Sequence, residues 1–142
     1  MLFPKKVKYR KWQTGRKNPL KLEKRVATRG TELSFGSHGL RAVTGARITA
    51  NQIEAARRVI SRSTGKTGRT WIRVFPDRPE TKKGAEVPMG AGKGDPYRFV
   101  VEVKPGHVLF EVDGVGDAMA REAFRKATAK LSVKTTVITR HA

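Results

Sequence analysis

Apolar residues recur along this chain at two different spacings, and each spacing predicts a type of element. Residues 49–63 and 117–131 carry apolar side chains at intervals of three and four, which places one apolar stripe on each of two helices. Alternating or short apolar runs predict strands at 69–76, 97–103, 107–112 and 133–139, and two short strands within 32–44. The order of these elements predicts a two-layer α+β domain with both helices on one face of a mixed sheet.

Local signals mark where these elements begin and end. Thr49 and Gln52 have the spacing of a capping box, so the first helix is expected to begin there. Asp117 is the expected N-cap of the second helix. Residues 104–107 place proline and glycine as a type II turn requires, which predicts an antiparallel hairpin between the flanking strands.

Isolated polar residues in these elements are expected at the surface. His38 is interpreted as a surface turn residue, and His107 as a residue at a strand end. Glu111 and Asp113 alternate along one strand, and we interpret them as a solvated strand edge rather than as paired catalytic carboxylates.

Residues 1–30 read as a basic extension in front of a single domain at 31–142. The extension has eleven lysines or arginines, one acid, and Tyr9 and Trp12 between the charges. Aromatic side chains among cations can stack on bases, so we favour a nucleic-acid-binding arm over a solvated disordered tail. The expected contacts are Lys5, Lys6, Lys8, Arg10, Lys11 and Arg16.

Residues 77–96 form a glycine- and lysine-rich loop between two predicted strands. Loops of this length are usually functional or disordered. Its lysines are compact charges that bind phosphate, and the expected contacts are Lys82, Lys83 and Lys93. A nucleotide-binding phosphate loop is excluded, because Lys93 is followed by Gly94 where such a loop requires serine or threonine. We interpret this segment as a finger pressed against a polyanion.

The first helix adds a third basic surface. Arg57, Arg58 and Arg62 lie beside or opposite its apolar stripe, and Glu54 is its only acid. We favour phosphate contact over an ordinary solvated helix face.

Composition supports an anionic partner for these surfaces. The 142 residues include 31 lysines and arginines against 12 acids, a formal net charge of +19. Such a charge suits nucleic acid, an acidic membrane surface or an acidic protein. No apolar run is long enough to span a membrane, and the basic N-terminus lacks the core of a secretory signal. Cysteine is absent, and the histidines lack the spacing of a metal site, so neither a cofactor nor catalysis is predicted.

Several segments together resemble the family of bacterial-type large-subunit ribosomal protein sixteen. The matching segments run in order along nearly the whole chain, at residues 1–11, 34–40, 48–58, 71–79, 89–94, 104–111, 120–124 and 130–135. The resemblance implies an α/β-hammerhead fold, binding to large-subunit ribosomal RNA, and a position beside the aminoacyl-tRNA. It also implies that the loop at 89–94 reaches toward the peptidyl-transferase region, which adds Met89, Gly90, Gly92 and Gly94 to the expected RNA contacts.

The chain departs from that family pattern in two places. The family usually has an arginine immediately before Met89, which some bacteria hydroxylate, and this chain has Pro88. Residues 18–31 also differ from the usual arm, so its path over RNA cannot be transferred from relatives.

The expected function is therefore that of a non-catalytic component of the large ribosomal subunit in cytoplasmic ribosomes. Expected partners are ribosomal RNA, tRNA and neighbouring ribosomal proteins, with no membrane and no second copy of the chain. A free-standing basic protein that organises RNA or DNA is the main alternative, and a small enzyme acting on nucleotides is a weaker one.

Overall fold

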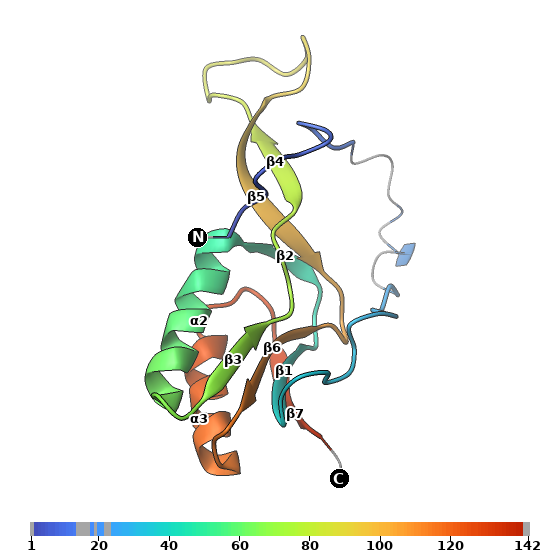
Figure 1. The fold of residues 1–142 in the computed structure, drawn as a ribbon. Helices are drawn as coiled ribbons and strands as arrows, with labels where there is room; N and C mark the ends of the chain where they lie inside the picture. The colour runs from blue at the N-terminus through green and yellow to red at the C-terminus, as the bar shows by residue number, and fades with distance from the viewer. Residues whose placement is uncertain (1, 14–17, 19, 22–23, 141–142) are drawn as a thin grey trace.

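The strands form two separate antiparallel sheets in the computed structural model, which describes residues 2–13, 18, 20–21 and 24–140 (Figure 1). One sheet has the order β3-β6-β1-β7 and the other β2-β5-β4. Arg16, one of the predicted contacts, lies outside the described residues. The strands are β1 (His38–Ala42), β2 (Ala46–Thr49), β3 (Arg69–Ile72), β4 (Arg78–Lys82), β5 (Asp95–Val103), β6 (Val108–Asp113) and β7 (Thr135–Thr139).

Two helices, α2 (Ala50–Thr64) and α3 (Asp117–Thr128), pack against each other and cover one face of the four-stranded sheet (Figure 1). Their apolar stripes form the core with the sheet, and Ile53, Ile60 and Phe124 are at most 1% exposed. Burying such side chains removes apolar surface from water, which is the main force that holds the two layers together. The α+β class and both helical stripes are confirmed.

The start of α2 is also confirmed, whereas α3 begins differently. The Thr49 hydroxyl accepts the N–H of Gln52 at 3.3 Å, and the Gln52 side chain accepts the N–H of Thr49 at 3.1 Å. In α3 the N-cap is Gly116, and Asp117 is the first helical residue. The Asp117 carboxylate lies 3.1 Å from Nε2 of His38, so His38 is a buried residue facing a helix rather than a surface turn residue.

The predicted arrangement of the strands is wrong in three respects. Residues 104–107 do form a turn, in which the N–H of His107 donates to the carbonyl of Lys104 at 3.2 Å. The strands that it joins nevertheless enter different sheets, because β5 pairs with β2 and β4 whereas β6 pairs with β1 and β3. The mixed sheet is thus replaced by two antiparallel ones, and residues 32–44 supply the single strand β1.

Glu111 is completely buried, which contradicts its assignment to a solvated edge. The strand register places it opposite Gly39 and Trp71, on the sheet face away from His38 and α3. The chain before β1 crosses this second face closely. A Cβ on Gly39 would lie 2.3 Å from the side chain of Leu33, so glycine makes room for the crossing segment.

The Glu111 carboxylate ties this crossing segment to the sheet. Its Oε1 accepts the backbone N–H groups of Ser34, Phe35 and Gly36 at 2.8, 3.1 and 3.2 Å. Its Oε2 accepts a hydrogen bond from Nη1 of Arg73 at 2.5 Å. Burial alone would raise the pKa of Glu111, but the bonds from Arg73 and from the three N–H groups outweigh burial and lower that pKa below its ordinary value. The segment is therefore held by an ionised side chain at neutral pH.

Replacing Glu111 by alanine should lower the free energy of unfolding by about 3–5 kcal/mol, because Arg73 and three N–H groups lose their partner. Glu111→Gln keeps an acceptor oxygen and should lose about 1–3 kcal/mol. Chemical denaturation measures both values. Glu122→Gln is the control, since this exposed carboxylate pairs with Arg125 and should cost at most about 1 kcal/mol. Equal losses for the Glu111 and Glu122 variants would contradict this assignment.

Candidate nucleic-acid interface

A β4–β5 hairpin projects from the body of the molecule and carries the predicted finger at its tip (Figure 1). The prediction that residues 77–96 form a loop is corrected, because Arg78–Lys82 pair with β5 as strand β4. Lys82 closes the ladder opposite Asp95, so the irregular tip spans 83–94. Pro79 lies within β4, and this is an edge strand, where the missing N–H of proline is tolerated.

The backbone of the tip turns back through three successive residues with positive φ. These are Gly90, Ala91 and Gly92, at 97°, 58° and 104°. The Lys83 ammonium donates to the carbonyl of Gly90, and this hydrogen bond stabilises the turn. Met89 stands next to it with its side chain fully exposed. The tip therefore presents a backbone-rich, apolar end rather than a cluster of free charges.

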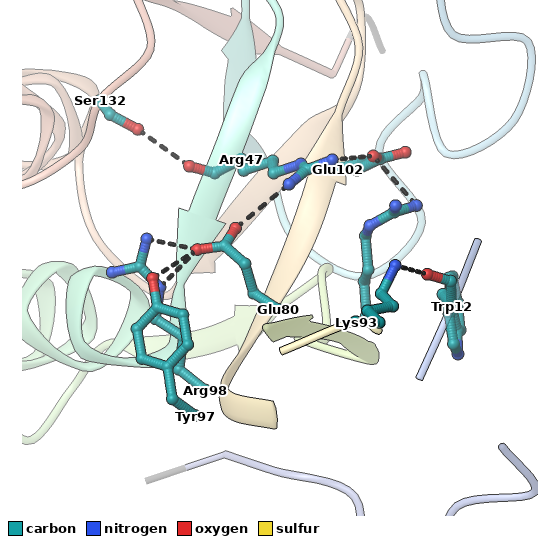
Figure 2. A network of polar contacts seen from close by, with 9 residues as sticks. Trp12, Arg47, Glu80, Lys93, Tyr97, Arg98, Glu102 and Ser132 are labelled. Atoms are coloured by element: carbon teal, nitrogen blue, oxygen red, sulfur yellow. Dashed lines mark hydrogen bonds and ion pairs between the residues drawn. The ribbon is translucent and has the colours of Figure 1, made fainter. Parts of the chain in front are cut away.

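The basic arm docks against this hairpin, so the structure brings two of the three predicted surfaces together. The Lys11 ammonium donates to the carbonyl of Lys93 at 3.2 Å. The Lys93 ammonium in turn donates to the carbonyl of Trp12 at 2.6 Å (Figure 2). The Arg78 guanidinium lies 5.6 Å from the centre of the Trp12 ring. Asp95 lies 4.0 Å from Lys11 and completes the junction.

An ion-pair network under this junction was missed by the sequence prediction. Arg47 on β2 bridges Glu80 and Glu102 at 3.3 and 3.4 Å (Figure 2). Arg98 lies 2.6 Å from Glu80, and Arg78 lies 3.3 Å from Glu102. Burial would raise the pKa of Glu80, but hydrogen bonds from Arg98 and its neighbours lower it. Opposite charges at alternate positions of adjacent strands are the signal that could have predicted this network.

The arginines of α2 form a separate surface that is partly neutralised. Arg57 lies 2.5 Å from the Glu54 carboxylate and Arg58 lies 3.2 Å from it. These hydrogen bonds, that of Arg57 foremost, lower the pKa of Glu54 to about 2. Arg62 is exposed and has no acidic partner among the described residues. No described contact joins these arginines to the arm or to the hairpin.

The outer part of the arm carries three exposed lysines, Lys5, Lys6 and Lys8. The Lys8 ammonium lies 5.5 Å from the centre of the Tyr9 ring, and within the described chain none of the three lysines has an ion-pair partner. These charges are therefore available to an external anion.

The described residues form neither a metal site nor a membrane-spanning helix. No three or more histidine, cysteine, aspartate or glutamate side chains come together as a metal site would require. No described helix has the length and apolar character needed to cross a membrane.

Comparison with known protein families matches Ribosomal protein L16p/L10e over residues 4–138, nearly the whole chain. The match includes the arm, both sheets, both helices and the projecting hairpin. Proteins of this family are structural, non-enzymatic components of the large ribosomal subunit. They bind ribosomal RNA and neighbouring ribosomal proteins. This chain therefore belongs to the Ribosomal protein L16p/L10e family.

Proposed function

We propose that the docked arm and hairpin form one continuous surface that binds large-subunit ribosomal RNA. The hairpin tip would reach toward the peptidyl-transferase region and contact the A-site tRNA, and in part the P-site tRNA. The observation that carries this proposal is the pair of reciprocal lysine bonds between Lys11, Trp12 and Lys93, which holds the arm along the hairpin. A surface assembled in this way can follow an RNA backbone over a longer path than either segment alone.

The distribution of charge around the hairpin favours phosphate as the ligand. The acids at its base, Glu80 and Glu102, are each engaged by two arginines. The lysines of the outer arm have no such partners within the described residues. Lysine binds phosphate as a point charge from many directions, which suits recognition of RNA by its backbone and shape.

The shape of the tip favours contact through the backbone. Gly90 and Gly92 lack side chains, so a phosphate or ribose can approach their peptide groups closely. Met89 is a flexible apolar side chain that can pack against a base or a sugar. Pro88 precedes it, so any contact that an arginine makes in relatives is absent here. The protein would act as a single copy in cytoplasmic ribosomes.

Sedimentation of cell extract tests the ribosomal assignment. Gradient centrifugation in moderate salt should place this protein with the large subunit, because many phosphate contacts hold it there. Recovery only in light fractions would show instead a free-standing RNA- or DNA-binding protein.

Two glycine variants separate the role of the tip from its folding. Gly92→Val meets no atom within 4 Å, but valine rarely adopts φ 104°, so the backbone of the exposed tip must change locally while the sheets and helices still fold. Reconstituted large subunits that carry this variant should bind A-site tRNA several-fold more weakly.

Gly94→Val is the matched comparison at the base of the tip. Its Cβ would lie 2.8 Å from the backbone carbonyl of Lys82, so β4 must move and the protein should lose about 1–3 kcal/mol of stability. Thermal unfolding measures this difference. A large loss of stability in Gly92→Val, together with normal tRNA binding, would contradict the proposed role of the tip.

A further inference from the structure

A hollow of about 290 Å³ lies where the arm, the start of α2 and strand β5 meet. Leu2 and Phe3 come from the arm, and the other lining residues come from 49–51 and 97–99. None of the predicted RNA contacts lines the hollow. The lining residues are Leu2, Phe3, Thr49, Ala50, Asn51, Tyr97, Arg98 and Phe99.

Two aromatic side chains stand open at this hollow. Phe3 is 61% exposed and Tyr97 is 49% exposed. The Tyr97 hydroxyl donates to Oε1 of Glu80 at 2.9 Å, which fixes the orientation of the ring. This bond also raises the pKa of Tyr97 above its ordinary value. An exposed ring held by its polar end costs little entropy when a flat ligand stacks on it.

The charge around the hollow selects the kind of ligand. The Arg98 guanidinium and the Lys82 ammonium lie over the Tyr97 ring, 5.0 and 5.8 Å from its centre. Arg98 is paired with Glu80, so Lys82 supplies the positive charge that is left for a ligand. None of the lining residues is an acid, and the first turn of α2 contains none. The nearest carboxylate, Glu80, is already engaged by two arginines. A ligand that is flat and apolar on one side and anionic on the other fits this arrangement.

We propose that this hollow binds one unpaired RNA base, which stacks on Tyr97 beside Phe3 while its phosphate lies against Lys82. The inference rests on the proposed RNA-binding function and gives it a site for a single-stranded nucleotide. Base stacking on exposed aromatic rings is the usual way in which proteins hold unpaired RNA. Duplex RNA offers no unstacked base, so it does not use this hollow.

Binding of the purified full chain to two RNA probes tests this site. The probes are a short oligoadenylate and an RNA duplex of the same length. Tyr97→Leu and Phe3→Ala should each weaken oligoadenylate binding by about five- to a hundredfold and leave duplex binding unchanged. Tyr97→Phe keeps the ring and should bind nearly as the natural chain does. Met119→Ala, which shortens an apolar side chain with 48% exposure on α3, is the matched control and should change neither affinity.

The outcomes separate this inference from the proposed function. If the natural chain binds neither RNA, the RNA-binding function itself fails. If both RNAs bind but the Tyr97 and Phe3 variants bind oligoadenylate normally, only the base site is overturned. Normal oligoadenylate binding with impaired entry of the variants into large subunits would also overturn it, since the hollow would then receive a protein side chain. If Tyr97→Leu does not fold, Phe3→Ala still tests the base site, because Phe3 lies in the arm outside both sheets.

Discussion

The buried carboxylate of Glu111 is the interaction on which the rest of the arrangement depends. It holds the segment before β1 across the helix-free face of the four-stranded sheet. The same segment continues along the 104–107 turn, where the carbonyl of Gly30 accepts the N–H of Val108, and Ala27 donates to the carbonyl of Pro105. One buried charge thus fixes a segment that lies 75 to 77 positions before it in the sequence. The arm is held on the hairpin by its own contacts, between Lys11, Trp12 and Lys93.

Arginine and lysine have different roles in this protein. Most arginines near the hairpin are bound to acids, as Arg47, Arg78 and Arg98 are to Glu80 and Glu102. The planar guanidinium can bridge two carboxylates, which suits it to hold adjacent strands together. The lysines of the outer arm lack acidic partners in the described part of the chain. The positive side chains therefore divide into arginines that pair with acids in the frame and lysines that are available to the proposed RNA ligand.

The sequence predicted those features that depend on near neighbours. The capping box of α2 joins residues three apart, and the apolar stripes of both helices repeat every three or four residues, so both were recognised. Glu111 was misplaced because its burial depends on Ser34, which is 77 positions away. Strand β4 was assigned to the glycine- and lysine-rich loop, since only its pairing with β5 reveals it as an edge strand. The arm and the finger were each predicted as RNA contacts, but their mutual contact follows from tertiary structure alone.

The most direct test of this account is the salt dependence of binding to large-subunit RNA. Replacing Lys5, Lys6 and Lys8 by alanine removes three unpaired charges from the arm, and replacing Lys126, Lys130 and Lys134 removes the same charge from exposed positions in and after α3. A plot of log affinity against log salt should be steep for the natural chain and the second variant, and shallower by about one unit per lysine for the arm variant. A flat plot for the natural chain, or equal slopes for all three proteins, would contradict the claim that the arm binds RNA phosphates.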